Sequence, residues 1–246
     1  VSWQRYRELC FREAVVHFSK LEDESTAAAL LEDLLDDAVP HTETLGFLEE
    51  QAEAGHFDSI RILVEHYGRQ GQWADLLRIL RLKLRSTEEP EGKRDILLEI
   101  SRLEETKLDH SDEALKAIGQ AYEQVPSETD LLRQLYQIAE RTGSFDTWFD
   151  EMTQALPRVE SVVERRGFMH AMGKVAREEL DNSPRAIDSY EKLLTEHPDD
   201  TSALLALDEL YDEAERWDER AEIIERRLSL SDDILERRKL GESLAG

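Results

Sequence analysis

Three short stretches set the period of this sequence: Gln70-Gly71-Gln72-Trp73, Thr142-Gly143-Ser144-Phe145 and Glu215-Arg216-Trp217. They place an aromatic residue at positions 73, 145 and 217, at a constant step of 72. The same step separates the basic pairs Lys93-Arg94, Arg165-Arg166 and Arg237-Arg238. Self-similarity at a fixed step is the sign of a repeat architecture. We infer an ungapped 72-residue repeat over residues 57–246.

Each repeat divides into two helical hairpins of about 38 and 34 residues, because turn signals alternate with apolar stripes at helical spacing. In residues 202–228 the apolar stripe runs through Leu204, Leu207, Tyr211, Ala221, Ile224 and Leu228, with Arg216-Trp217 as the turn. Pro126 and Pro198 precede such pairs and exclude a continuous helix. Helices this short are marginal alone, so they must bury their stripes against neighbouring hairpins.

The pattern resembles the tetratricopeptide-repeat (TPR) family. The residues that carry the resemblance are Met169, Met172-Gly173 and Ala176 on a first helix and Ala186, Tyr190, Leu193 and Pro198 on the second. Glycine stands at the signature place in only one unit, and the 38-residue units predict a hairpin turn longer by a residue or more. The resemblance implies an all-α, right-handed α-solenoid of stacked antiparallel helix hairpins, a TPR-like superhelix. Its concave face, lined by first helices, would bind an extended peptide or a helix of another protein.

The composition agrees with an all-α chain, since 246 residues include only 11 Gly and 6 Pro. We predict one continuous solenoid with diverged hairpins in 1–56, double repeats in 57–128 and 129–200, and a truncated repeat in 201–246. Within the first segment, residues 27–38 and 44–54 read as two helices separated by Val39-Pro40. Both ends resemble half-hairpins, which suggests a fragment of a longer array and allows self-association through uncapped ends.

Carried over from the family, the groove positions are Arg61, Glu65, Leu98, Arg102, Arg133, Gln137, His170, Lys174, Leu205 and Glu209. We take Arg61, Arg102, Arg133, Gln137, His170 and Lys174 as the candidate partner-binding residues. Four of the ten positions are Arg or Lys, so one interpretation is a basic groove for an acidic peptide or a terminal carboxylate. The other is ordinary surface charge, paired to carboxylates on adjacent helices.

Two further groups of side chains have both a functional and a structural interpretation. The turn aromatics Trp73, Phe145 and Trp217, and also Trp148 and Trp3, read better as packing residues than as peptide-stacking residues. Arg78, Arg81 and Arg85 form a basic stripe at i, i+3 and i+7. We interpret this stripe as a solvated helix face rather than as a site for an acidic partner.

The remaining composition disfavours several function classes. A formal charge of −25 disfavours a nucleic-acid partner, because phosphates would be repelled. The seven His show no paired-ligand spacing and Cys10 is the only cysteine, so we expect no metal and no cofactor. No apolar run approaches the roughly 18 residues that span a bilayer. The lone cysteine fits a reducing compartment, and we expect a cytoplasmic protein.

The function expected from this pattern is a non-enzymatic scaffold that binds a protein or peptide partner, with no nucleic acid and no membrane insertion. An alternative is the regulatory or substrate-recruiting segment of an enzyme whose catalytic domain lies outside residues 1–246. The sequence holds no recognisable nucleophile elbow or phosphate loop that would favour catalysis within the chain itself.

Overall fold

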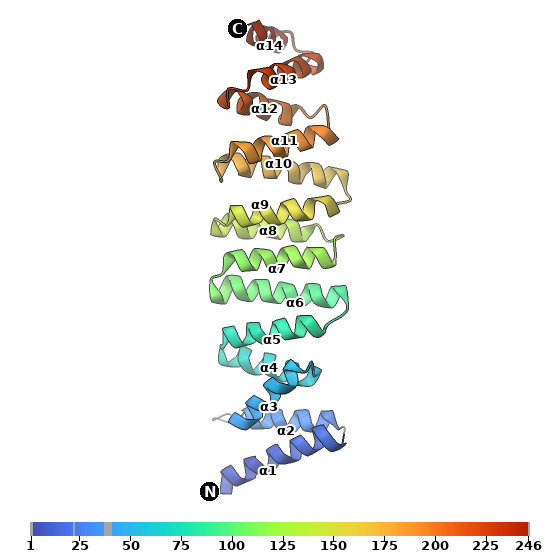
Figure 1. The fold of residues 1–246 in the computed structure, drawn as a ribbon, viewed down its shortest axis with the longest axis vertical. Coiled ribbons are helices and arrows are strands. Elements are labelled where there is room, and N and C mark those ends of the chain that lie inside the picture. Colours follow the sequence, from blue (N-terminus) through green and yellow to red (C-terminus); the bar gives the residue numbers. More distant parts are fainter. Residues whose placement is uncertain (1, 22, 37–40, 246) are drawn as a thin grey trace. The chain divides into compact units, whose positions relative to one another are not determined.

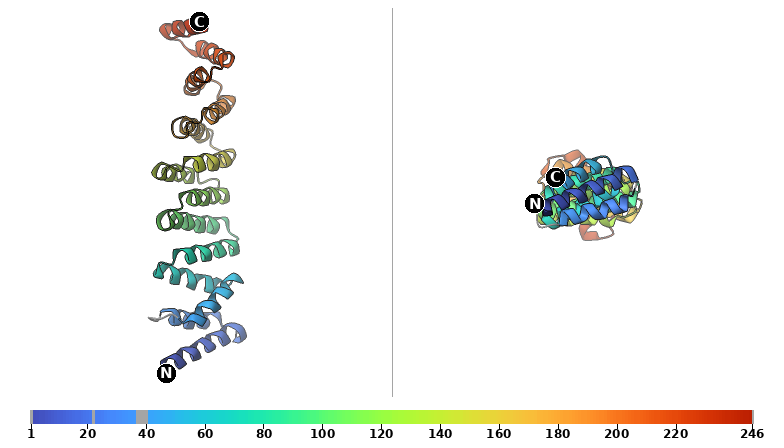
Figure 2. Two further views of the ribbon diagram at one scale, coloured as in Figure 1. Left: turned by 60° about the vertical axis from the view of Figure 1, so that its left-hand side comes forward. Right: turned by 90° about the horizontal axis from the view of Figure 1, so that it is seen from below.

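The computed structural model describes residues 2–21, 23–36 and 41–245, and the regular structure in these ranges is helical (Figure 1). The chain divides into two compact units, Val1–Val125 (unit 1) and Pro126–Gly246 (unit 2). Within each unit, consecutive helices run back and forth beside one another, as both directions of view show (Figures 1 and 2). The predicted all-α class and the antiparallel helix hairpins are confirmed.

Unit 1 holds the first seven described helices. They are α1 (Ser2–Val16), α2 (Glu24–Asp36), α3 (Thr42–Glu53), α4 (Phe57–Gln70), α5 (Trp73–Ser86), α6 (Pro90–Leu103) and α7 (Ser111–Gln124). Short π-helical turns, His17–Leu21 and Glu104–Leu108, prolong α1 and α6. The expected helix over 27–38 is observed as α2, and the one over 44–54 as α3; residues 37–40 lie outside the described residues.

Unit 2 holds the other seven. They are α8 (Asp130–Thr142), α9 (Phe145–Ala155), α10 (Val162–Glu178), α11 (Ser183–Glu196), α12 (Thr201–Glu213), α13 (Trp217–Leu230) and α14 (Ile234–Ala245). A 3-10 turn, Leu156–Arg158, follows α9 because Pro157 cannot continue the α-helix. By repeat register α2, α4, α6, α8, α10 and α12 are first helices, and α3, α5, α7, α9, α11 and α13 are second helices.

The backbone repeats with the same step as the sequence. The hairpin turns after α4, α8 and α12 each contain one residue in the left-handed region, namely Gly71 (φ 68°), Gly143 (φ 76°) and Glu215 (φ 55°). The turns before α7 and α11 do the same at Asp109 (φ 58°) and Asp181 (φ 47°). The intervals between these five turns match the two predicted hairpin lengths in alternation. The double repeat of TPR-like hairpins is therefore confirmed by turn geometry.

The longer units have a longer first helix, and one of them also has a longer turn. First helices of the shorter hairpins, α4, α8 and α12, have 14, 13 and 13 residues, whereas α10 has 17. In α6 the 14 α-helical residues continue into the five-residue π-helical turn. The predicted longer turn is observed between α10 and α11, where residues 179–182 separate the helices, against two or three residues after α4, α8 and α12. Between the second π-helical turn and α7 only residues 109 and 110 intervene, so the added residues there keep making helical backbone hydrogen bonds.

The tyrosines of the repeat signature form part of the core of the hairpins. Tyr67, Tyr190 and Tyr211 are 2%, 7% and 4% exposed. The phenol of Tyr67 donates to Glu49 at 2.6 Å, and that of Tyr211 donates to Glu191 at 2.6 Å. The rings are thus packed between helices while two of the hydroxyls reach a carboxylate at the edge.

The aromatic residues at the turns divide into two groups. Phe145 and Trp148 are buried as predicted, and Trp73 is half-buried. Trp217 and Trp3 are 55% and 59% exposed, so packing roles for these two were wrong. Trp3 stacks on Tyr6 instead, with ring centroids 5.5 Å apart.

Candidate partner-binding site

In unit 1 the candidate residues are Arg61 on α4 and Arg102 on α6. The Arg61 guanidinium lies 2.6 Å from Glu32 of α2, the neighbouring first helix, and 3.4 Å from Asp58. The hydrogen bond to Glu32 raises the pKa of Arg61, against the opposite effect of its partial burial. Arg102 is exposed, and its side chain has no hydrogen bond or ion pair with the described residues. Arg61 thus links two first helices through an ion pair, whereas the exposed Arg102 could bind a carboxylate of a partner.

In unit 2, Arg133 and Gln137 lie one turn apart on α8. Arg133 pairs with Asp130 of its own helix and reaches Glu164 of α10 at 2.7 Å. Glu164 also accepts a hydrogen bond from Thr129 at 2.9 Å, which fixes the carboxylate between the two helices. Gln137 is exposed. Arg133 is therefore engaged in the same way as Arg61, which stands one double repeat earlier in the sequence.

His170 of α10 belongs to a cluster around Asp200, the N-cap of α12. The Asp200 carboxylate lies 2.9 Å from His170 Nε2 and 2.6 Å from Arg166 Nε, and it accepts the Ala203 backbone N–H at 2.9 Å. Burial acts to raise the pKa of Asp200, but the Ala203, His170 and Arg166 hydrogen bonds outweigh it and the pKa is lowered. The cluster holds α10 and α12 together through a capping residue.

Lys174 occupies the place in the repeat that Arg102 occupies in unit 1. Its Nζ is 3.7 Å from Glu178, and the side chain is 67% exposed. One turn further along α10, Arg177 bridges Glu209 at 2.6 Å and Glu213 at 2.7 Å on α12. We call the surface that carries Arg61, Arg102, Arg133, Gln137, His170 and Lys174 the first-helix face of its unit. Neighbouring helices thus already supply carboxylates to Arg61, Arg133 and His170.

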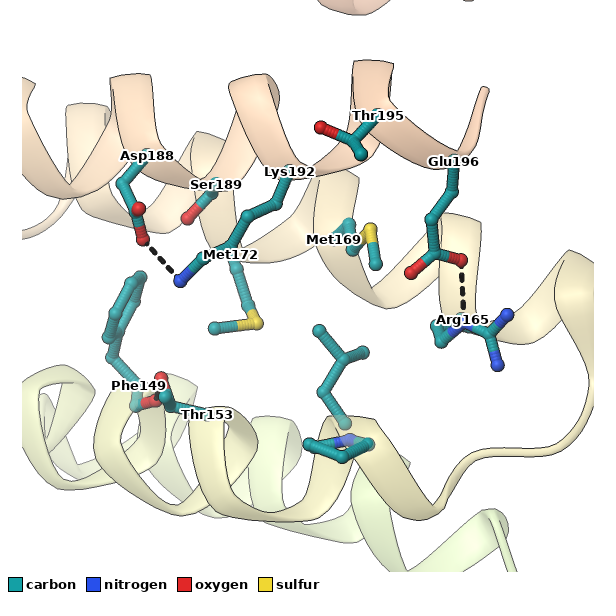
Figure 3. A pocket seen from close by; sticks show the side chains of 12 residues that line it. Phe149, Thr153, Arg165, Met169, Met172, Asp188, Ser189, Lys192, Thr195 and Glu196 are labelled. Atoms are coloured by element: carbon teal, nitrogen blue, oxygen red, sulfur yellow. Dashed lines mark hydrogen bonds and ion pairs between the residues drawn. The ribbon is translucent and has the colours of Figure 1, made fainter. Parts of the chain in front are cut away.

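A second candidate site, absent from the sequence predictions, is an apolar groove in unit 2 (Figure 3). It has a volume of about 430 Å³ and lies between the second helices α9 and α11, with α10 beneath. Phe149, Met169 and Met172 line it, and we call it the methionine groove. Two ion pairs lie on its rim, Lys192–Asp188 at 2.6 Å and Arg165–Glu196 at 2.8 Å.

Unit 1 contains a smaller groove of about 140 Å³ at the equivalent place. Seven of its nine lining residues stand one double repeat before a lining residue of the methionine groove: Arg81, Leu84, Leu97, Ile100, Lys116, Ala117 and Gln120. The two grooves are therefore copies of one feature of the double repeat. Once one groove is known from the structure, the repeat register locates the other.

One ion pair accounts for the different sizes. In unit 1, Arg81 reaches across to Glu104, whose carboxylate is 1% exposed, at 3.1 Å. His110 Nδ1 is 2.9 Å from the other oxygen of Glu104. In unit 2 the residues one double repeat later are Thr153 and Ala176, which are too short to fill the space. Of the basic stripe, Arg81 thus pairs with a buried carboxylate, which the interpretation as a solvated face did not predict.

One group in unit 1 has the composition of a metal site. Glu8, His41 and Glu43 can each offer a ligand atom within 4.8 Å of the others. This group could not be predicted from the sequence, because Glu8 lies on a different helix from Glu43. In the structure Glu8 pairs with Arg12 at 2.6 Å, and His41 Nδ1 is 3.0 Å from Thr44 Oγ1. Two of the three residues therefore already have protein partners.

Comparison with known proteins yields structures of low similarity. No family model and no curated protein sequence matches this chain. A crystal structure of the MamA protein aligns with a TM-score of 0.37 at 13% identity, over 78% of this chain and 96% of that chain. The APC/C hetero-tetramer Cut9–Hcn1 aligns with a TM-score of 0.37 at 12% identity, over 97% of this chain and 46% of the matched chain. This chain thus spans less than half of the latter.

The chain's own hairpins, and not these alignments, define its fold, a TPR-like helical repeat. Among the described residues, no helix combines the length and the apolar content needed to cross a bilayer.

Proposed function

We propose that this chain is a non-enzymatic protein-interaction scaffold that binds a partner peptide or helix on its first-helix face. The observation that carries the proposal is the set of ion pairs between successive first helices: Arg61–Glu32, Arg133–Glu164 and His170–Asp200. They fix the helices that form this face, and a preorganised surface loses less entropy on binding.

We propose that the partner contacts those candidate residues that take no part in these ion pairs between helices. Arg102 and Lys174 are exposed cations at equivalent places of the two units, and Gln137 offers an exposed amide. Within each unit, an acidic residue of a partner would gain charge-assisted hydrogen bonds from the exposed cation. Arg61, Arg133 and His170 have a structural role instead. A partner carboxylate could bind them only by displacing the carboxylate with which each is already paired. The preferred partner is an acidic protein segment.

The test compares the parent chain with a variant that carries Arg102→Glu, Gln137→Glu and Lys174→Glu. Partners are captured from the source lysate and identified by mass spectrometry over a salt series. The control, Gln4→Glu with Lys20→Glu and Arg85→Glu, makes the same charge change at exposed positions outside the face. We expect partners that weaken with salt, are lost by the first variant and are kept by the control. Equal capture by all three proteins would contradict the proposal.

A further inference from the structure

The methionine groove has an apolar floor that can adapt to a guest. Met169 and Met172 on α10 and Phe149 on α9 contribute it, and Figure 3 shows them between the two layers of helix. Methionine is unbranched and polarisable, so it fits irregular apolar groups. A volume of about 430 Å³ is within the range of ligand-binding clefts. The floor therefore suits one bulky apolar side chain.

The charged residues around the groove disfavour a negatively charged partner. The lining cations Lys192 and Arg165 are each paired with a carboxylate, at 2.6 Å and 2.8 Å. Beside the groove, Arg185 is shared by Asp146 at 2.9 Å and Asp150 at 3.5 Å, with its guanidinium 5.0 Å from the Phe149 ring centroid. An acidic segment would thus compete with resident carboxylates for every one of these cations.

The carboxylates beside the groove can still accept further hydrogen bonds. The side chains of Asp146, Asp150 and Asp188 are 79%, 63% and 58% exposed. An ionised carboxylate has about four lone-pair sites, and each of these three uses only part of them. Lysines or arginines on a partner could bind there without displacing a resident ion pair. The complementary partner is therefore basic.

We propose that the methionine groove binds a single Leu, Met or Phe side chain of a partner protein, carried on a basic segment. None of the residues that define the first-helix face lines this groove, so the two sites are separate. The equivalent groove of unit 1 is too small for such a guest, since the Arg81–Glu104 pair fills that place. The assignment depends on the side chains of unit 2 and not on the function proposed above.

Methionine-methyl NMR tests this directly, because the chain has only three methionines. The protein is labelled at its methionine methyl groups and titrated with the blocked heptapeptide Lys-Lys-Ala-Phe-Ala-Lys-Lys. We expect the Met169 and Met172 signals to move, while Met152, which is buried and does not line the groove, moves much less. Absence of any movement up to millimolar peptide would overturn the proposal.

Two control peptides separate the two parts of the proposal. Replacing Phe by Ala should weaken binding at least about tenfold, since the anchor is lost, and so should replacing the four Lys by Glu. If the Ala peptide moves Met169 and Met172 as strongly, the groove does not hold the anchor. If the Glu peptide binds as well, the partner is not basic.

A protein variant places the binding in the groove. Thr153→Arg introduces the residue that unit 1 has at this place, and position 153 is exposed enough to accept it without unfolding. We expect at least about tenfold weaker binding of the Phe peptide. Gln154→Arg adds the same charge on α9 outside the groove and should bind like the parent. Equal binding by Thr153→Arg would overturn the assignment.

Discussion

Gly173 of α10 and Tyr190 of α11 are in such close contact that a Cβ atom on residue 173 would lie 2.5 Å from Tyr190 Cζ. Real Cβ atoms do not approach a ring this closely, and both residues are buried, so neither can move aside into solvent. The glycine of the TPR signature therefore exists here because the second-helix tyrosine occupies the space of a side chain. The first and second helices pack at this distance only if residue 173 has no side chain.

Gly173→Ala should lower the free energy of unfolding by about 1–3 kcal/mol, the usual cost of overpacking a core. The sign of this change in the free energy of unfolding is informative, because Gly→Ala at a helix position with free space around it is stabilising. Gly167, on the same helix, has no atom within 4 Å of its added Cβ, so Gly167→Ala should gain about 0.5–1 kcal/mol. Urea unfolding of both variants checks the pair. Equal effects of the two would show that α10 and α11 are not packed as described.

Glu215 takes the left-handed conformation that Gly71 and Gly143 take in the equivalent turns. A residue with a Cβ is strained there, so Glu215→Gly should stabilise the chain by up to about 1 kcal/mol, after the entropy cost of glycine. Ala214→Gly, at the preceding residue with φ −88°, lacks that strain and should destabilise. Thermal unfolding distinguishes them, and a loss of stability in Glu215→Gly would contradict the turn geometry.

Asp200, which links α10 and α12, makes the stability of unit 2 depend on pH. The pKa of Asp200 is lower in the folded chain than its ordinary value of 3.8. The charged carboxylate therefore makes its full contribution to the free energy of unfolding above pH 3.8. The contribution is lost as pH falls through the folded pKa, because the folded state must then take up a proton. Asp200→Asn keeps an N-cap acceptor but removes the charge that faces Arg166 and His170.

The expected cost of Asp200→Asn is about 1–3 kcal/mol at pH 7, and the difference from the parent should shrink below pH 4. Denaturant unfolding at several pH values measures it. Asp199→Asn, at the exposed neighbouring residue, serves as the control and should stay close to the parent throughout. A difference that does not change with pH would rule out the charge of Asp200 as its source.

Arg81 neutralises the buried carboxylate of Glu104. Arg81→Gln should destabilise unit 1 by about 1–2 kcal/mol, less than for a fully buried pair because the Arg81 side chain is 54% exposed. Arg85→Gln, on the same helix and exposed, should change stability by less than about 0.5 kcal/mol. If Arg81→Gln destabilises unit 1 because it leaves the Glu104 charge unpaired, then Arg81→Gln should be nearly neutral in a Glu104→Gln background. A full cost of Arg81→Gln in the Glu104→Gln background would exclude this pair.

The hairpins could be predicted from sequence because their determinants are local and recur once in every double repeat. Gly71, Gly143 and the aromatic residues that follow them mark the turns, and the tyrosines mark the core. The partners of Arg61 and Arg133 could not be predicted, since Glu32 and Glu164 come from neighbouring first helices, a whole hairpin away along the chain. The methionine groove also needed the structure, because its lining residues come from three helices that only the fold brings together.

Hydrogen exchange of the chain with and without a captured partner tests the proposed binding face most directly. We expect slower exchange in the first helices α6, α8 and α10 around Arg102, Gln137 and Lys174, and little change in α5, α7 and α13. Protection confined to α9 and α11 would contradict binding on the first-helix face and leave the methionine groove as the site of that partner.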